Sequence, residues 1–363
     1  MPACEVCHRP DPETYADEYL CDGGDREWPL ILGAMAASTV VYLLYPFFPT
    51  LDGYNRGAIM ARLGLYESYD ITPQLWIDTL DRMEIESTVL YPTAGLSFTT
   101  IQDPAWAIAL ARAYNNWFHD RYHRRSKRLR AMALIPLQSV PDAVKELRRA
   151  VVELGAVGAV LPANSADVGV RKCFGDPEFW PIYEEAERLN VPLATHGAPS
   201  MNLGINSFTH FAATQALEHP ISQMIQLTSF IMEGVFDRFK SLRVGFLEAG
   251  TGWVPYMIDR LDRAYGAWAK RDMREFSEHM KSSPSEVFAS GRLYFSCEGG
   301  EPSMKDLIAR IGSRSIMFAS DYPHESNVER AMHEVAELLE RDDLPEEAKQ
   351  AIMCDNVAAF YGR

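Results

Sequence analysis

The feature that most limits how this chain can fold is a regular alternation, from about residue 70 onward, of short apolar runs and longer amphipathic segments. The short runs are rich in β-branched residues, and this alternation is the pattern of βα units around a parallel sheet. A closed barrel of this kind has eight such units, and seven runs are found. We therefore predict a TIM (β/α)8 barrel with an atypical or degraded first strand, with an open doubly wound sheet of seven strands as the alternative. The predicted strands are residues 88–91, 129–135, 157–161, 191–195, 243–247, 293–296 and 315–319.

Helices are predicted where a proline stands at the start of an amphipathic segment, because proline fits the first turn of a helix. Each such segment spaces apolar residues three or four positions apart, so that one face can pack on the sheet. The predicted helices are residues 73–83, 104–123, 141–154 and 177–189.

The first fifty residues differ in composition from the rest. Residues 1–27 carry eight acidic residues and two Arg, whereas residues 28–51 carry no charge. The uncharged stretch is long enough to cross a bilayer, but it contains three prolines and lacks the basic leader of a signal peptide. We expect a buried or interfacial segment in which residues 40–45 are the candidate for the missing strand. The predicted organisation is an atypical segment at 1–50 and a barrel domain at 51–363.

Charge and cysteine content exclude several classes of partner. The 363 residues include 35 Lys and Arg against 50 Asp and Glu, a formal net charge of −15. Such a chain lacks the basic face that nucleic acid requires, and an anionic membrane would repel it. Six scattered Cys do not form a disulfide scaffold, so a reducing cytoplasm is expected. The predicted partner is a small-molecule substrate, and a homodimer is compatible with the sequence.

Titratable residues stand within two positions after four consecutive predicted strands, namely His196, Glu248, Glu298 and Asp321. Because the carboxyl ends of barrel strands meet at one face, we expect a pocket there. An imidazole and a carboxylate suit a divalent metal such as zinc, and a further carboxylate can move a proton. We predict His196 and Asp321 as metal ligands, and Glu248 or His324 as the catalytic acid–base group.

Each of these residues also has a purely structural interpretation. His196 could be a core histidine, Asp321 a turn former or cap, and Glu248 a partner for backbone or an arginine. His324 could orient a ligand without touching the metal. We expect His210 and His219 in a pocket wall or at the surface, and solvated positions for His119, His123, His279 and His333.

The loops that follow the strands are polar, contain few cations and carry aromatic residues. We predict that Arg56 holds a substrate carboxylate, although it could equally be a surface charge. Asn164, Trp253 and Tyr322 are predicted as further substrate contacts. A mixed aromatic and polar pocket suits a small aromatic or unsaturated carboxylic acid.

A family resemblance lies in four runs of the sequence, which are LATHGAPS, GFLEAGTGWVPYMIDRLDR, IMFASDYPH and CDNVAAFYG. Together they resemble the amidohydrolase-related superfamily, and most closely its branch of aminocarboxymuconate-semialdehyde decarboxylase. The resemblance covers roughly residues 51–363 and implies a TIM-barrel metalloenzyme for decarboxylation or hydrolysis. It also implies that His196 and Asp321 match metal ligands of the family, whereas Glu248 stands where the decarboxylases place a catalytic His.

One element of the family pattern is missing. The family's first strand ends in His-x-His, which supplies two metal ligands, and no His-x-His occurs in this chain. Residues 1–27 could replace the true first strand through truncation or mistranslation, or the site could be degenerate. Ligands could also come from elsewhere, including Cys4, Cys7 and His8. That Cys-x-x-Cys-His run is also the attachment signature of c-type haem, but without an export signal we expect a loose thiol pair.

These observations predict a metal-dependent decarboxylase (carboxy-lyase) or hydrolase of a small, aromatic or unsaturated carboxylic acid. The metal is expected to be zinc first and manganese second, and weak or absent if the N-terminal ligands are missing. The alternatives are a lactone or amide hydrolase that uses Glu248 as base, and a catalytically degenerate barrel.

Overall fold

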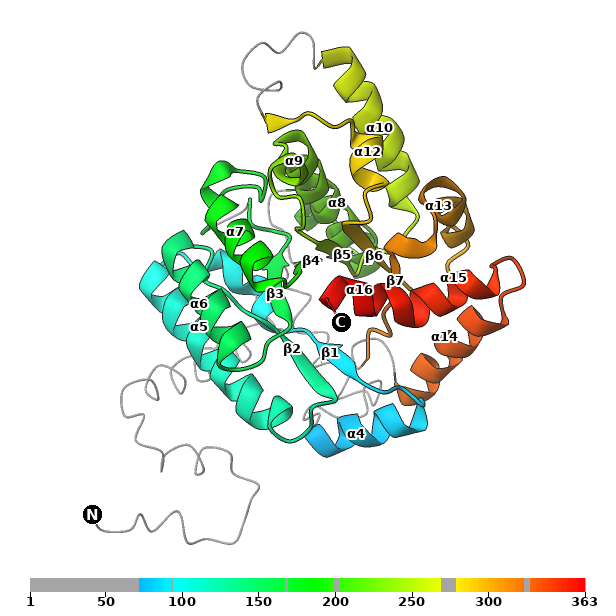
Figure 1. The fold of residues 1–363 in the computed structure, drawn as a ribbon, viewed down its shortest axis with the longest axis horizontal. Helices are drawn as coiled ribbons and strands as arrows, with labels where there is room; N and C mark the ends of the chain where they lie inside the picture. The colour runs from blue at the N-terminus through cyan, green and yellow to red at the C-terminus, as the bar shows by residue number, and fades with distance from the viewer. Residues whose placement is uncertain are drawn as a thin grey trace, which may run out of the picture. The chain divides into compact units, whose positions relative to one another are not determined.

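The computed structural model describes residues 72–92, 94–166, 169–198, 203–268, 279–322 and 327–362. Within them, seven parallel strands pair in sequence order from β1 to β7, and helices lie around the curved sheet (Figure 1). All seven predicted strands are present, and their ends lie within two residues of the predicted ends. The strands are β1 (Thr88–Leu90), β2 (Leu129–Ala133), β3 (Gly158–Pro162), β4 (Leu193–His196), β5 (Val244–Leu247), β6 (Leu293–Cys297) and β7 (Ile316–Phe318).

Side chains alternate between the two faces of each strand, and from β3 to β6 both faces are largely buried. In β5, Val244 and Phe246 pack with the surrounding helices, whereas Leu247 packs inside the barrel. Parallel strands covered on both faces read as continuous apolar runs, which is why the sequence located them. The core therefore has an inner cluster within the barrel and an outer cluster beneath the helices.

Local sequence signals set the helix starts. Thr72 and Asp103 cap the helices that begin at Pro73 and Pro104 by accepting hydrogen bonds from backbone N–H groups, and proline follows each cap. The predicted helix at 104–123 changes at its end into a π-helical turn, η5 (His119–His123). The helices are α4 (Pro73–Arg82), α5 (Pro104–Phe118), α6 (Val140–Val152), α7 (Trp180–Leu189), α8 (Phe211–Met232), α9 (Val235–Arg238), α10 (Trp253–Trp268), α12 (Pro284–Phe288), α13 (Met304–Ile311), α14 (Val328–Glu340), α15 (Glu346–Gln350) and α16 (Asn356–Tyr361).

The C-terminal helix α16 packs on the interior of the barrel, and Figure 1 shows it in front of the strands. The Phe360 ring is fully buried, with its centroid 4.9 Å from that of Tyr294 in β6. A Cβ on Gly245 of β5 would lie 2.9 Å from the Phe360 ring. Because Arg243 donates a hydrogen bond to the Phe360 carbonyl at the start of β5, α16 covers the end of the barrel where the strands begin.

The eighth strand and the division of the chain stay predictions. The candidate strand at 40–45, and the whole of the predicted segment 1–50, lie outside the described residues. In the described part of the chain, no helix is long and apolar enough to cross a membrane.

Candidate active site

The last residue of β4 and the residue that follows β5 meet at the carboxyl end of the barrel. His196 ends β4 and pairs in register with Leu247, the residue before Glu248. Neighbouring parallel strands lie about 4.8 Å apart, so their end groups come into contact. His196 Nδ1 lies 3.0 Å from Glu248 Oε2. The structure therefore brings together two of the residues that the sequence selected.

The contact defines which nitrogen of neutral His196 carries the proton. Nδ1 also lies 2.9 Å from the carbonyl oxygen of Gly197. Because both neighbours of Nδ1 are acceptors, Nδ1 donates and Nε2 keeps its lone pair. This is the orientation that metal-binding histidines adopt, in which one ring nitrogen is held by protein and the other is presented to the ligand.

Two residues at the strand ends have a left-handed backbone that favours glycine. Glu248 has φ 59° and Asp321, after β7, has φ 50°. Residues held in this region cost of order 1–3 kcal/mol and occur most often at functional sites. The Glu248 N–H donates a hydrogen bond of 2.8 Å to Ser296 Oγ in β6, which helps to hold the strained turn.

Helix α8 supplies a third titratable group, His219, that sequence reasoning did not select. Its Nδ1 lies 3.8 Å from Glu248 Oε1. A Cβ on Gly197 would lie 2.4 Å from the His219 ring, so glycine at that position leaves room for the imidazole. The available signal was the spacing of His219, Gln223 and Gln226, which places three polar residues on one face of a helix in which most residues are apolar.

The site is partly shielded from solvent and bordered by tyrosine. The side chains of His196, His219 and Glu248 are 12%, 23% and 26% exposed. The Tyr91 ring lies 5.8 Å from that of His196, and its hydroxyl bonds that of Tyr361 at 2.8 Å. Burial raises the pKa of both tyrosines, so both stay protonated near neutral pH.

Asp321 lies among acidic groups beyond β6 and β7. The pKa of Glu298 is raised, first by burial and then by the charges of Glu334, Glu301 and Asp321. The pKa of the buried Cys297 thiol is also raised, chiefly by burial, so this cysteine is a packed thiol rather than a nucleophile.

The described residues do not by themselves form a metal centre. In that part of the chain, no group of three or more His, Cys, Asp or Glu side chains is placed to hold a metal ion. His196 and Asp321 both stand at strand ends as predicted. His324 and Arg56, the predicted acid–base and carboxylate-binding residues, lie outside the described residues.

The three described residues that were predicted to contact substrate are buried. Asn164 is 2% exposed and accepts a hydrogen bond from Thr99. Trp253 is 7% exposed, and its indole donates to the Gly250 carbonyl. Tyr322 is 8% exposed and packs edge-on against Trp76. Their contact with a substrate stays a prediction; their observed contacts hold the loops at the strand ends.

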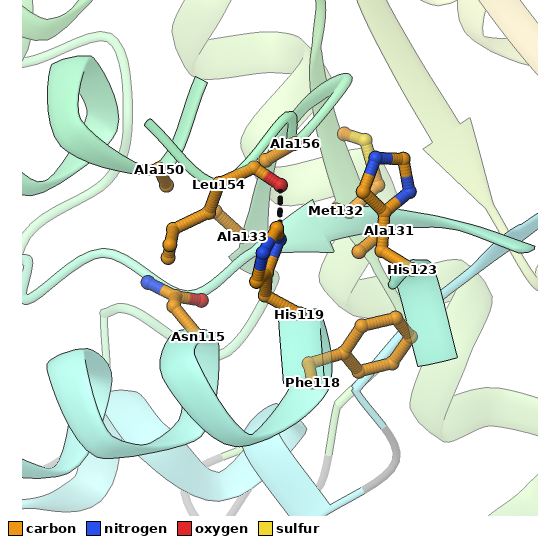
Figure 2. Close-up of a pocket in the computed structure, with 10 residues that line it drawn as sticks. All are labelled: Asn115, Phe118, His119, His123, Ala131, Met132, Ala133, Ala150, Leu154 and Ala156. Atoms are coloured by element: carbon orange, nitrogen blue, oxygen red, sulfur yellow. Dashed lines mark hydrogen bonds between the residues drawn. The ribbon is translucent and has the colours of Figure 1, made fainter. Parts of the chain in front are cut away.

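A small cavity of about 10 Å³ lies beside β2, lined by Ala131, Met132 and Ala133 and by residues around η5, and none of the residues that line it belongs to this site (Figure 2). It adjoins η5, where Nδ1 of His119 and of His123 lie 2.7 and 3.0 Å from the carbonyl oxygens of Leu154 and Leu129. The expectation that these two histidines are solvated is wrong. They are half-buried and join the end of α5 to the start of β2 and the end of α6.

Comparison with known proteins identifies a family and several relatives that are named as decarboxylases. Residues 87–363 match the family model described as Amidohydrolase. A gamma-resorcylate decarboxylase of Rhodococcus jostii is 29% identical over 78% of this chain and 85% of its own length. A 2-amino-3-carboxymuconate-6-semialdehyde decarboxylase of Dictyostelium discoideum is 26% identical over 69% of this chain and 66% of its own length.

Solved structures agree on the fold. A 2,6-dihydroxybenzoate decarboxylase from Rhizobium superposes with a TM-score of 0.65 at 25% identity, over 79% of this chain and 87% of that one. A dihydroxybenzoic acid decarboxylase from Polaromonas, with bound manganese and 2-nitroresorcinol, superposes with a TM-score of 0.63 at 23% identity, over 79% and 84% of the two chains. The predicted TIM-barrel fold class is confirmed.

Proposed function

Because this chain belongs to the amidohydrolase family, we propose that it is a metal-dependent decarboxylase of a small aromatic carboxylic acid, with its active site at the ends of β4 and β5. The expectation of an enzyme of the amidohydrolase-related type is confirmed by the family match. The observation that carries the proposal is the contact between His196 and Glu248, 3.0 Å apart at the carboxyl end of the barrel. The relatives named above are decarboxylases, which favours carbon–carbon bond cleavage over hydrolysis.

Decarboxylation of an aromatic acid replaces the carboxylate on a ring carbon by a proton. The reaction needs a group that delivers a proton to that carbon before the carbon–carbon bond breaks and its electron pair returns to the ring. Glu248 is partly exposed and is held between His196 and His219, so it can deliver this proton and regain one from solvent. The products are carbon dioxide and the ring bearing the new hydrogen.

The other predicted site residues keep their proposed roles. We propose His196 and Asp321 as ligands of a divalent metal, either the zinc that the sequence suggested or manganese, which the Polaromonas decarboxylase binds. The remaining ligands would come from residues outside the described part of the chain. His324 is proposed as a second acid–base group and Arg56 as the group that holds the substrate carboxylate. Asn164, Trp253 and Tyr322 are proposed to shape the substrate pocket.

A substrate panel tests the proposal. The purified protein, supplied with zinc or manganese, is incubated with 2,6-dihydroxybenzoate, 5-carboxyvanillate and related hydroxybenzoates while released carbon dioxide is measured. Turnover of at least one acid that depends on added metal supports the proposal. Hydrolysis of lactones or amides without carbon dioxide release would favour a hydrolase, and no turnover of either class would favour a degenerate barrel.

The cellular compartment and the oligomeric state of the protein are two further proposals. We propose a cytoplasmic enzyme, since six scattered cysteines suit a reducing compartment. The homodimer stays a prediction, which light scattering on the purified protein tests.

A further inference from the structure

Helix α8 presents a polar stripe to the strand ends, although most of its residues are apolar. His219, Gln223 and Gln226 lie at positions i, i+4 and i+7, which share one helix face. Both glutamines are fully buried, at 0% exposure. A buried amide is costly unless its donors and acceptor are satisfied, so the partners of each glutamine show what it holds.

Gln223 holds the two strand ends that carry His196 and Glu248. Its side-chain Nε2 donates to the carbonyl of Thr195 at 3.1 Å and to the carbonyl of Leu247 at 2.7 Å. Its Oε1 accepts from Thr195 Oγ1 at 2.7 Å. These two carbonyls belong to the residues directly before His196 and Glu248, so one side chain joins the backbones that orient both groups.

This connection lies where the sheet itself gives little support. The last backbone hydrogen bond between the two strand ends runs from the Gly197 N–H to the Leu247 carbonyl and is 3.3 Å long. Beyond it, Glu248 turns into its left-handed conformation. The Leu247 carbonyl therefore accepts a shorter hydrogen bond from the Gln223 amide than from the Gly197 N–H, at the point where the pairing of β4 with β5 ends.

We propose that Gln223 is a positioning residue, which fixes the separation of His196 from Glu248 without touching substrate. The proposal rests on the proposed function, because it assigns Gln223 a part in that reaction. Misplacement of a catalytic group by about 1 Å can cost on the order of 100-fold in rate. Loss of the amide is therefore expected to reduce kcat more than it changes KM.

Gln226 offers a matched control on the same helix. It is equally buried and also makes three hydrogen bonds, donating to the Ala163 carbonyl and Ser165 Oγ and accepting from the Phe174 N–H. These partners belong to the segment after β3. Ala163 also donates a backbone hydrogen bond of 2.9 Å to the His196 carbonyl, but Gln226 bonds neither the Thr195 nor the Leu247 carbonyl that Gln223 joins. A stability effect common to both glutamines can thus be separated from an effect on the site.

The experiment compares Gln223→Met with Gln226→Met, because methionine keeps the length of glutamine and removes its hydrogen bonds. Four quantities are measured: the melting temperature, kcat and KM on the best acid of the panel, and the imidazole ¹⁵N shifts of His196. We expect similar losses of melting temperature. Gln223→Met should lower kcat by about 10- to 100-fold with KM changed less than about threefold, and should shift the His196 signals. Gln226→Met should keep kcat within about threefold and shift those signals less than Gln223→Met does, because it leaves the bonds to the Thr195 and Leu247 carbonyls in place.

Two results would overturn the proposal. One is an equal loss of kcat in both variants; the other is a Gln223→Met protein whose His196 signals and kcat match the wild type. If Gln223→Met does not fold, Thr195→Val replaces it, because this variant removes the hydrogen bond from Thr195 Oγ1 to Gln223 Oε1. It must lower kcat and shift the His196 signals in the same direction, by a smaller amount. If the wild-type protein turns over none of the acids, the proposed function fails, while the His196 signals still decide whether Gln223 positions this residue.

Discussion

Glu248 is the residue on which the proposed chemistry depends. It contacts histidines from two different elements, β4 and α8, and its backbone is left-handed. Strain of this kind persists where the surrounding structure over-determines a residue. The sequence resemblance places a histidine at this position in related decarboxylases, so in this chain a carboxyl group between two imidazoles takes that place.

We expect Glu248→Gln to abolish most turnover while the fold is kept. Glutamine preserves the size of the side chain but cannot transfer a proton, and general acid–base catalysis contributes about 10²- to 10⁴-fold. Steady-state kinetics and thermal unfolding check this. The control is Glu301→Gln, because Glu301 holds the Thr251 N–H and hydroxyl: it should lose about 1 kcal/mol of stability and keep its kcat. A Glu248→Gln enzyme with wild-type kcat would exclude the proposed role.

Gly197→Ala tests whether the position of the His219 ring matters for stability and for turnover. The new Cβ would lie 2.4 Å from the His219 ring and must displace it, with an overpacking cost of about 1–3 kcal/mol. We expect lower stability in urea denaturation and a lower kcat. Gly266→Ala in α10, where a Cβ meets nothing within 4 Å, should instead raise stability by about 0.5–1 kcal/mol. If both substitutions act alike, the packing argument is wrong.

Glu185 gives a pH-dependent contribution away from the site. Hydrogen bonds from Arg188 and Arg148 lower the pKa of this buried carboxyl to about 2. A lowered pKa in the folded state stabilises the fold above the unfolded pKa of about 4.3, and this stabilisation is lost as pH falls towards 2. Glu185→Gln should cost about 1–2 kcal/mol at pH 7, because both arginines are partly exposed. The difference from wild type, measured by urea denaturation, should shrink between pH 4.3 and 2; a constant difference would contradict it.

At the scale of elements, prediction succeeded where one local signal sufficed. The strands were found because both of their faces are buried, and α4 and α5 because Thr72 and Asp103 cap them before a proline. Helix α8 was not delimited, since it is apolar on most sides, contains Pro220 and turns its polar stripe inward. The functional face of α8 is the one that contacts the ends of β4 and β5. Those strand ends are distant from part of the helix in sequence, so no local pattern shows which face contacts them.

The element α16 supports the barrel from its opposite end, and Phe360→Ala tests this. The ring is fully buried against Tyr294 and Gly245, so its removal should cost about 3–5 kcal/mol. Urea denaturation measures this. Leu339→Ala, at a residue that is 51% exposed, should change stability by less than about 0.5 kcal/mol. Equal losses of unfolding free energy in the two variants would show that packing of α16 against the core does not stabilise the barrel.

At the scale of the whole molecule, the order of βα units was enough to predict which groups share a face. His196 and Glu248 were selected because they follow adjacent strands, and the structure brings them into contact. His219 was expected only in a pocket wall or at the surface, and Gln223 was not singled out, because both reach the site from a helix. The division at residues 1–50 and 51–363, like the origin of the missing metal ligands, stays a prediction.

The central claim is that this barrel releases carbon dioxide from an aromatic acid through Glu248. The most direct measurement is release of ¹³CO2 from carboxyl-labelled 2,6-dihydroxybenzoate and its hydroxybenzoate analogues, for the wild type and Glu248→Gln in the presence of manganese or zinc. The account predicts labelled gas from the wild type and at least about 100-fold less from the variant. Equal release from both proteins, or none from the wild type with any acid and either metal, would contradict it.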